Sequence, residues 1–66
     1  RVGRNEEAIK VLKDALEIDS KYAEAYRLIG VAQLQLKQNK EACASFAKAK
    51  ELGDPNVDAL IEKHCK

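Results

Sequence analysis

The feature that most constrains this chain is an internal similarity between two segments that lie 34 residues apart. Glu6–Ile18 (EEAIKVLKDALEI) and Lys40–Leu52 (KEACASFAKAKEL) align over their whole length without a gap. In both segments, small and apolar residues recur at spacings of three and four, as they do along one face of an α-helix. The matching pairs are Ala8 with Ala42, Leu12 with Phe46, and Ala15 with Ala49. We therefore expect a helical unit that the chain repeats.

The stretch Ala23–Pro55 contains two helical patterns, a short polar joint and an exit marked by proline. Large and small packing residues alternate along it, at Tyr26, Ile29, Gly30, Gln33, Ala42, Phe46 and Pro55. This alternation resembles the tetratricopeptide repeat, whose pattern runs Trp-x-x-Leu-Gly-x-x-Tyr, then Ala-x-x-x-Phe, then Pro. Gln33 stands where that family has an aromatic residue, and Pro55 comes one residue later than usual.

The resemblance implies an all-α fold in which antiparallel helix hairpins form an α-solenoid of about four helices, including a carboxy-terminal cap helix. The periodicity predicts these helices at residues 6–18, 21–37, 40–52 and 55–65. The expected division is the second helix of an incomplete repeat (1–20), one full repeat (21–54) and a capping helix (55–66). The chain is thus expected to be the carboxy-terminal piece of a longer array.

Local signals predict how the helices begin and end. A turn at residues 3–5 would place Asn5 as the first N-cap. The resemblance implies a left-handed backbone at Lys37, where the family often has glycine, and that conformation would cost a lysine about 1 kcal/mol. Gly53 reads as the C-cap of the third helix, and Asp54 and Pro55 read as the N-cap and first residue of the last.

Packing between the helices also follows from the pattern. The second helix is apolar nearly all round, so we expect it between the first and third helices. A glycine within a helix costs about 1 kcal/mol relative to alanine, so Gly30 should mark a close contact with Ala42 and Phe46.

The first helix should pack only one face. Its stripe of Ile9, Leu12 and Leu16 should contact the second helix, while the opposite side lacks a partner. The residues expected to be more exposed to water there are Val11, Ala8 and Ala15.

Composition excludes several functional classes. Charged residues make up 35% of the 66 residues, yet the net charge is only +1. That balance predicts neither nucleic-acid binding nor attraction to an acidic membrane surface. The apolar runs are too short for a transmembrane helix or a signal peptide. The compartment stays open, with the cytoplasm slightly favoured.

The residues predict no catalytic, cofactor or metal site, and no enzymatic activity. His64 is the only histidine, and nothing around it suggests a catalytic constellation. His64 and Cys65 are adjacent on a helix and point about 100° apart, so they are poorly placed to share a metal with Cys43.

The two cysteines are expected to lie on one seam between the third and last helices. Cys43 is equivalent to Ile9 in the internal alignment, which suggests a small buried hydrophobic residue. Antiparallel pairing at Gly53–Pro55 would place Cys43 and Cys65 level with each other. Packed helix axes lie about 8–10 Å apart, whereas a disulfide needs Cα atoms within about 7 Å, so we expect two reduced thiols.

One stripe suggests a function. In the tetratricopeptide family, the first helix of each repeat lines a concave wall against which partner peptides lie. Carried over by position, that wall would consist of Glu24, Arg27, Val31, Leu34 and Gln35, extended on the last helix by Asp58 and Ile61. The alternative is an ordinary polar flank, with Val31 and Leu34 packed against neighbouring helices.

Three functional hypotheses therefore remain. The resemblance implies a scaffold or adaptor that binds a partner protein or peptide on the concave face. The alternative is a structural segment that forms a homo-oligomer through the open edge of its first helix. A redox or enzymatic role of the two thiols is the weakest of the three.

Overall fold

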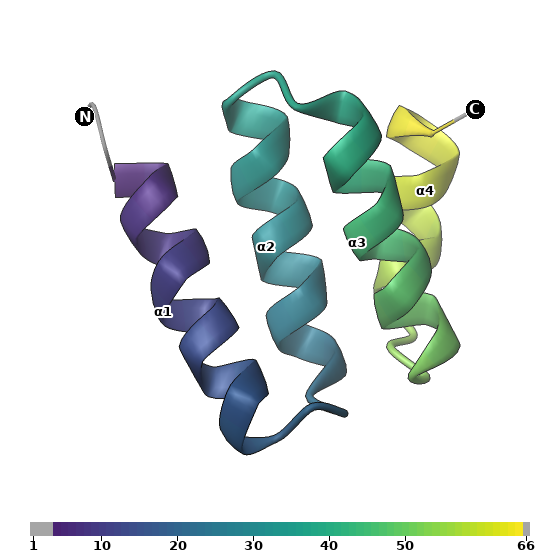
Figure 1. The fold of residues 1–66 in the computed structure, drawn as a ribbon. Coiled ribbons are helices and arrows are strands. Elements are labelled where there is room, and N and C mark those ends of the chain that lie inside the picture. The colour runs from purple at the N-terminus through teal and green to yellow at the C-terminus, as the bar shows by residue number, and fades with distance from the viewer. Residues whose placement is uncertain (1–3, 66) are drawn as a thin grey trace.

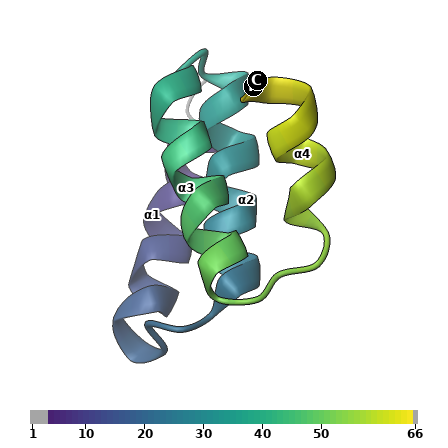
Figure 2. The same ribbon diagram turned by 90° about the vertical axis from the view of Figure 1, so that its right-hand side faces the viewer.

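The computed structural model describes residues 4–65, which fold into four α-helices joined by short turns (Figure 1). The helices are α1 (Arg4–Ile18), α2 (Ala23–Gln35), α3 (Asn39–Glu51) and α4 (Val57–His64). Successive helices run antiparallel, with α2 between α1 and α3. Figure 2 shows α4 to one side of α2 and α3. The all-α prediction and the central position of the second helix are confirmed.

The turns after α2 and α3 use the same hydrogen-bond pattern. Lys37 has a left-handed φ of 62°, and the next N–H donates to the carbonyl of Gln33 at 2.8 Å. Gly53 has a φ of 97°, and the next N–H donates to the carbonyl of Ala49 at 3.0 Å. Both turns thereby bond a carbonyl that the helix end leaves without an intrahelical partner. The predictions for Lys37 and Gly53 are confirmed.

Two predicted N-caps are wrong. Helix α1 already includes Asn5, and the rest of the predicted turn, at Gly3, lies outside the described residues. Asparagine is tolerated here because the first-turn N–H groups have no intrahelical acceptor in any case. Helix α4 begins at Val57, two residues later than expected. Asp54 lies three residues before this start, and its carboxylate accepts hydrogen bonds within the preceding turn, from the Asn56 N–H at 2.8 Å and from Arg27 at 2.7 Å.

The best-packed part of the core lies where α3 meets α2 and α4. Its fully buried side chains are Ala42, Phe46, Ala49 and Val57. Gly30 lies against the Phe46 ring, and a Cβ atom at Gly30 would be 2.7 Å from Phe46 Cδ1 and closer still to Cε1. Any side chain at Gly30 would therefore collide with the ring, which confirms the predicted reason for this glycine.

Helix α1 is much less buried. None of its residues is fully buried, and Ile9, Leu12 and Leu16 are only half-buried. Val11 is 65% exposed and Ala8 is also exposed, as predicted for the side that lacks a partner. Ala15 is half-buried, so the prediction holds for it only in part.

The two cysteines form a disulfide, and the expectation of reduced thiols is wrong. Their Cα atoms lie 5.7 Å apart, which confirms the predicted seam between the third and last helices. Cys65 follows the last residue of α4 and has a φ of −120°, so its backbone has left the helical path. The usual spacing of helix axes does not apply at that point, and the two sulfur atoms can meet.

Among the described residues, no helix combines the length and the apolar character that crossing a bilayer requires.

Candidate functional site: a hollow between α1 and α2

A hollow of about 600 Å³ lies between α1 and α2, and we call it the α1–α2 hollow. It is open to solvent and mostly apolar. Its lining residues are Arg4, Asn5, Glu7, Ala8, Val11 and Leu12 from α1, and Leu28, Val31, Ala32 and Gln35 from α2. Ala8 and Ala32 have small side chains, which leave space between the backbones of the two helices.

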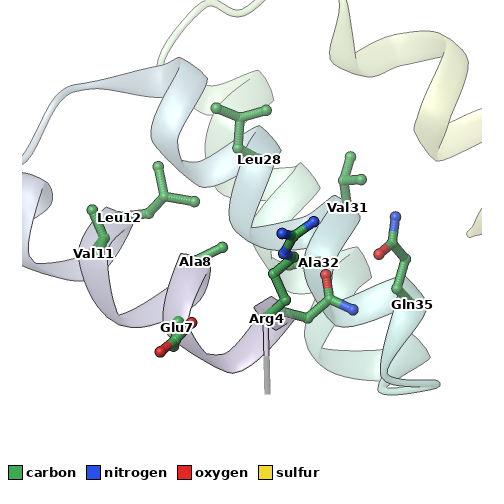
Figure 3. Close-up of a pocket in the computed structure, with 10 residues that line it drawn as sticks. Arg4, Glu7, Ala8, Val11, Leu12, Leu28, Val31, Ala32 and Gln35 are labelled. Carbon is green, nitrogen blue, oxygen red and sulfur yellow. The ribbon is translucent and has the colours of Figure 1, made fainter. Parts of the chain in front are cut away.

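Figure 3 shows how the lining side chains are arranged. Leu12 and Leu28 stand on opposite helices, and Val31 and Gln35 follow along α2. Arg4 extends from α1 toward α2, while Glu7 lies at the outer edge. The hollow therefore presents an apolar surface with polar groups at its border, an arrangement common in binding sites of proteins.

The residues of the predicted concave wall have different surroundings in the structure. Val31 and Gln35 lie in the α1–α2 hollow. Leu34 and Ile61 are half-buried against the core cluster around Phe46. For Leu34, and in part for Val31, the alternative of packing against neighbouring helices therefore has support.

Arg27 lies between two carboxylates. Its Nε donates to Asp54 Oδ2 at 2.7 Å, and an amino nitrogen of the guanidinium lies 3.6 Å from Glu24 Oε2. The Arg27 side chain is 21% exposed and that of Asp54 only 5%. This contact connects α2 to the turn between α3 and α4, so Arg27 has a packing role in addition to any role in binding.

The environment of Asp54 favours its charged form. Burial alone would raise the pKa of the Asp54 carboxyl, but the hydrogen bond from Asn56 and the Arg27 guanidinium outweigh burial and lower the pKa below its ordinary value of 3.8. Asp54 is therefore ionised near neutral pH. Arg27 thus has two carboxylate neighbours, those of Asp54 and Glu24. The Glu24 side chain is 53% exposed, so it also faces solvent.

Asp58 lies on a different contact. Its Oδ1 is 3.2 Å from Lys50 Nζ, and both side chains are more than half exposed. The ion pair joins α4 to α3, and exposed pairs of this kind contribute at most about 1 kcal/mol.

Sequence reasoning missed the part of the site that α1 contributes. The prediction treated Val11 and Ala8 as an uncovered edge and did not join them to Leu28 of α2. A usable signal was present, because Leu28 and Val31 are apolar and lie one turn apart on the outer side of α2.

Metal-ligating side chains are not clustered in the described part of the chain. No group of three or more His, Cys, Asp or Glu side chains gathers there in a metal-binding arrangement. Cys43 and Cys65 are bonded to each other, and a disulfide sulfur is not a thiolate ligand.

Comparison with known proteins agrees with this architecture. A family model described as "TPR repeat" matches residues 2–37, and one described as "Tetratricopeptide repeat" matches residues 23–52. No curated protein shows a significant match. No solved structure matches significantly either. The first family model alone covers more than half of the sequence, so the chain belongs to the tetratricopeptide repeat family.

Proposed function

We propose that this chain is a protein-binding scaffold or adaptor module, and that its partner contacts the α1–α2 hollow together with the exposed face of α2. Tetratricopeptide repeats generally mediate protein–protein interactions. The observation that carries the proposal is the hollow itself, because it leaves Val11 and Leu28 exposed in a small domain.

The charges favour one kind of partner. Glu24 shares Arg27 with the buried Asp54, so these three side chains together carry one net negative charge. A partner segment that places an aliphatic side chain in the hollow and a lysine or arginine near Glu24 would complement both features. Of the predicted wall residues, Val31, Gln35 and Glu24 would make the principal contacts, Arg27 and Leu34 would support them, and Asp58 and Ile61 would extend the surface.

Titration with matched peptides tests this proposal. The probe is a synthetic peptide containing one leucine and one arginine, compared with versions that carry serine for leucine or glutamate for arginine. Binding is followed by amide chemical shifts of the ¹⁵N-labelled protein. We expect shifts around Val31 and Leu28 with the parent peptide, and affinity at least about tenfold weaker with either substituted peptide, which corresponds to about 1.4 kcal/mol.

Variants of the protein locate the surface. Val31→Ser and Glu24→Gln should each weaken binding, whereas Ala44→Ser, an exposed change on α3, should not. Equal affinity for all three peptides, or shifts confined to α3 and α4, would contradict the proposal.

A second candidate is self-association through the edge of α1, which the 65% exposure of Val11 favours. In that case the molar mass should rise with protein concentration in sedimentation equilibrium, and Val11→Glu should restore the monomer. A monomeric mass at every concentration would exclude this candidate.

The proposal also covers catalytic activity, other classes of partner and the division of the chain into repeats. We propose no catalytic activity, and no nucleic-acid or membrane partner, because the net charge is only +1 and the hollow is mostly apolar. The division into residues 1–20, 21–54 and 55–66 is proposed on the internal alignment.

A further inference from the structure

We propose that the Cys43–Cys65 disulfide is a reversible redox latch, which holds α4 on α3 when it is oxidised and releases α4 when a dithiol reductant opens it. The bond joins α3 to the residue that follows α4, with the two Cα atoms 5.7 Å apart. Both cysteines are half-buried, so part of each residue lies at the protein surface. Access of this kind is a condition for thiol–disulfide exchange.

Helix α4 is short, and its packing against the rest of the protein is mainly apolar. The helix has eight residues, and an isolated helix of that length is not stable in water. Within residues 57–64, Val57 is the one fully buried side chain, while Leu60 and Ile61 are half-buried. The ion pair from Lys50 to Asp58 joins two exposed groups and holds the helix weakly. The disulfide therefore adds a covalent link to a short helix that packs through one fully buried and two half-buried side chains.

The chain itself shows that cysteine is not needed for packing at this seam. The residues 34 positions earlier are Ile9 on α1 and Val31 on α2, and both are half-buried. An aliphatic pair thus occupies the equivalent positions where α1 meets α2. What Cys43 and Cys65 add to such a pair is a covalent bond that thiols can open and close.

The chemistry of opening is ordinary exchange. A thiolate of the dithiol reductant attacks one sulfur of the disulfide and forms a mixed disulfide, and the sulfur that leaves takes up a proton. The second thiol of the reductant then closes its own disulfide and releases the other cysteine. Two electrons and two protons pass from the reductant to Cys43 and Cys65. A low-molecular-weight disulfide such as oxidised glutathione reverses the reaction.

Opening the latch changes the surface at this end of the molecule. When α4 leaves, Val57 enters water, and the core cluster loses the cover that Val57 gives to Ala49 and Phe46. An apolar side of α3 then becomes available to another helix. The α1–α2 hollow is formed by other residues, so the latch does not depend on the function proposed above.

Amide hydrogen exchange of the ¹⁵N-labelled chain tests the latch. One sample is oxidised with oxidised glutathione, a second is reduced with dithiothreitol, and alkylation with iodoacetamide followed by mass measurement counts the free thiols. In the oxidised protein, the amides of Ile61 and Cys65 should be protected nearly as well as that of Phe46. After reduction they should exchange about a hundredfold faster, and clearly faster than Phe46.

The equivalent pair supplies the matched control. The Cys43→Ile, Cys65→Val double variant should show the same exchange with and without dithiothreitol, which would assign the change in the wild-type protein to its cysteines. The proposal is overturned if reduced wild-type protein keeps α4 as well protected as oxidised protein. It is equally overturned if folded protein forms no disulfide with oxidised glutathione, or if the control responds to dithiothreitol as the wild type does.

Discussion

Helices α1 and α3 have similar sequences but very different surroundings. Phe46 and Ala42 on α3 are fully buried, whereas the residues 34 positions earlier, Leu12 and Ala8, are half-buried and exposed. The difference arises because α3 packs against both α2 and α4, whereas the described part of α1 packs mainly against α2. The same apolar pattern therefore produces core in one half of the molecule and an accessible surface in the other.

The largest expected effect is on the free energy of unfolding, at the equivalent positions of α3 and α1. Phe46→Ala should lower the free energy of unfolding by about 3–5 kcal/mol, since it empties a fully buried site. Leu12→Ala, at the equivalent half-buried site, should cost about 1 kcal/mol because less apolar surface is lost. Urea unfolding, followed by the helical circular dichroism signal, measures both. Equal losses would show that α1 is as well packed in solution as α3.

Gly30→Ala tests how closely α2 and α3 pack against each other. The new methyl group would collide with the Phe46 ring, so we expect a loss of about 1–3 kcal/mol, although alanine favours helix by about 1 kcal/mol. Adding Phe46→Leu, the residue type found at position 12, should recover part of the loss. Thermal unfolding of the single and double variants would show whether the two changes are coupled, and strict additivity would speak against the contact.

The stability that Asp54 contributes at the α3–α4 turn should depend on pH. Its folded-state pKa lies below the unfolded value, so its stabilisation is present above about pH 4 and is lost as the pH falls through the folded pKa. Relative to Asp54→Asn, the wild type should be more stable by about 1 kcal/mol near neutral pH. Urea titrations at a series of pH values should show this difference shrinking in acid. A difference that grows in acid would contradict the assignment.

The smallest effect is expected on the exposed side of α1. Val11→Ser introduces the residue type that stands 34 positions later, at Ser45. Because Val11 is 65% exposed, the free energy of unfolding should change by less than about 0.5 kcal/mol. A loss above 1 kcal/mol, on the scale of Leu12→Ala, would mean that something covers Val11 in solution.

Much of the fold could be predicted because it depends on periodic patterns and on single residues that the sequence shows directly. Apolar periodicity identified the four helices, the residue type predicted the turn at Gly53, and the family resemblance predicted the left-handed backbone at Lys37. The contact of Gly30 with Phe46 was also predictable, since a glycine within a helix calls for a reason. Each of these signals is carried by the helical pattern itself or by a residue type with a specific backbone role.

The missed features depend on which polar or sulfur-containing side chains meet across the helices, and no pattern in the sequence marks these meetings. Arg27 meets Asp54 across 27 residues, and neither residue carries a sign of the other in the sequence. Gln33 is 8% exposed and accepts a hydrogen bond from the Ser45 hydroxyl at 2.7 Å, which explains how a polar side chain replaces an aromatic one. The disulfide formed because the chain leaves its helical path at Cys65, a detail finer than the predicted helix boundary.

The contact of Gly30 with Phe46 also gives the molecule a built-in spectroscopic probe. Phe46 is the single phenylalanine of the chain, which contains no tryptophan, and its ring lies directly against the backbone of Gly30. The magnetic field of the ring current should move an α-proton of Gly30 away from its usual resonance position. That one line would report, without any label or substitution, whether α2 and α3 are packed together.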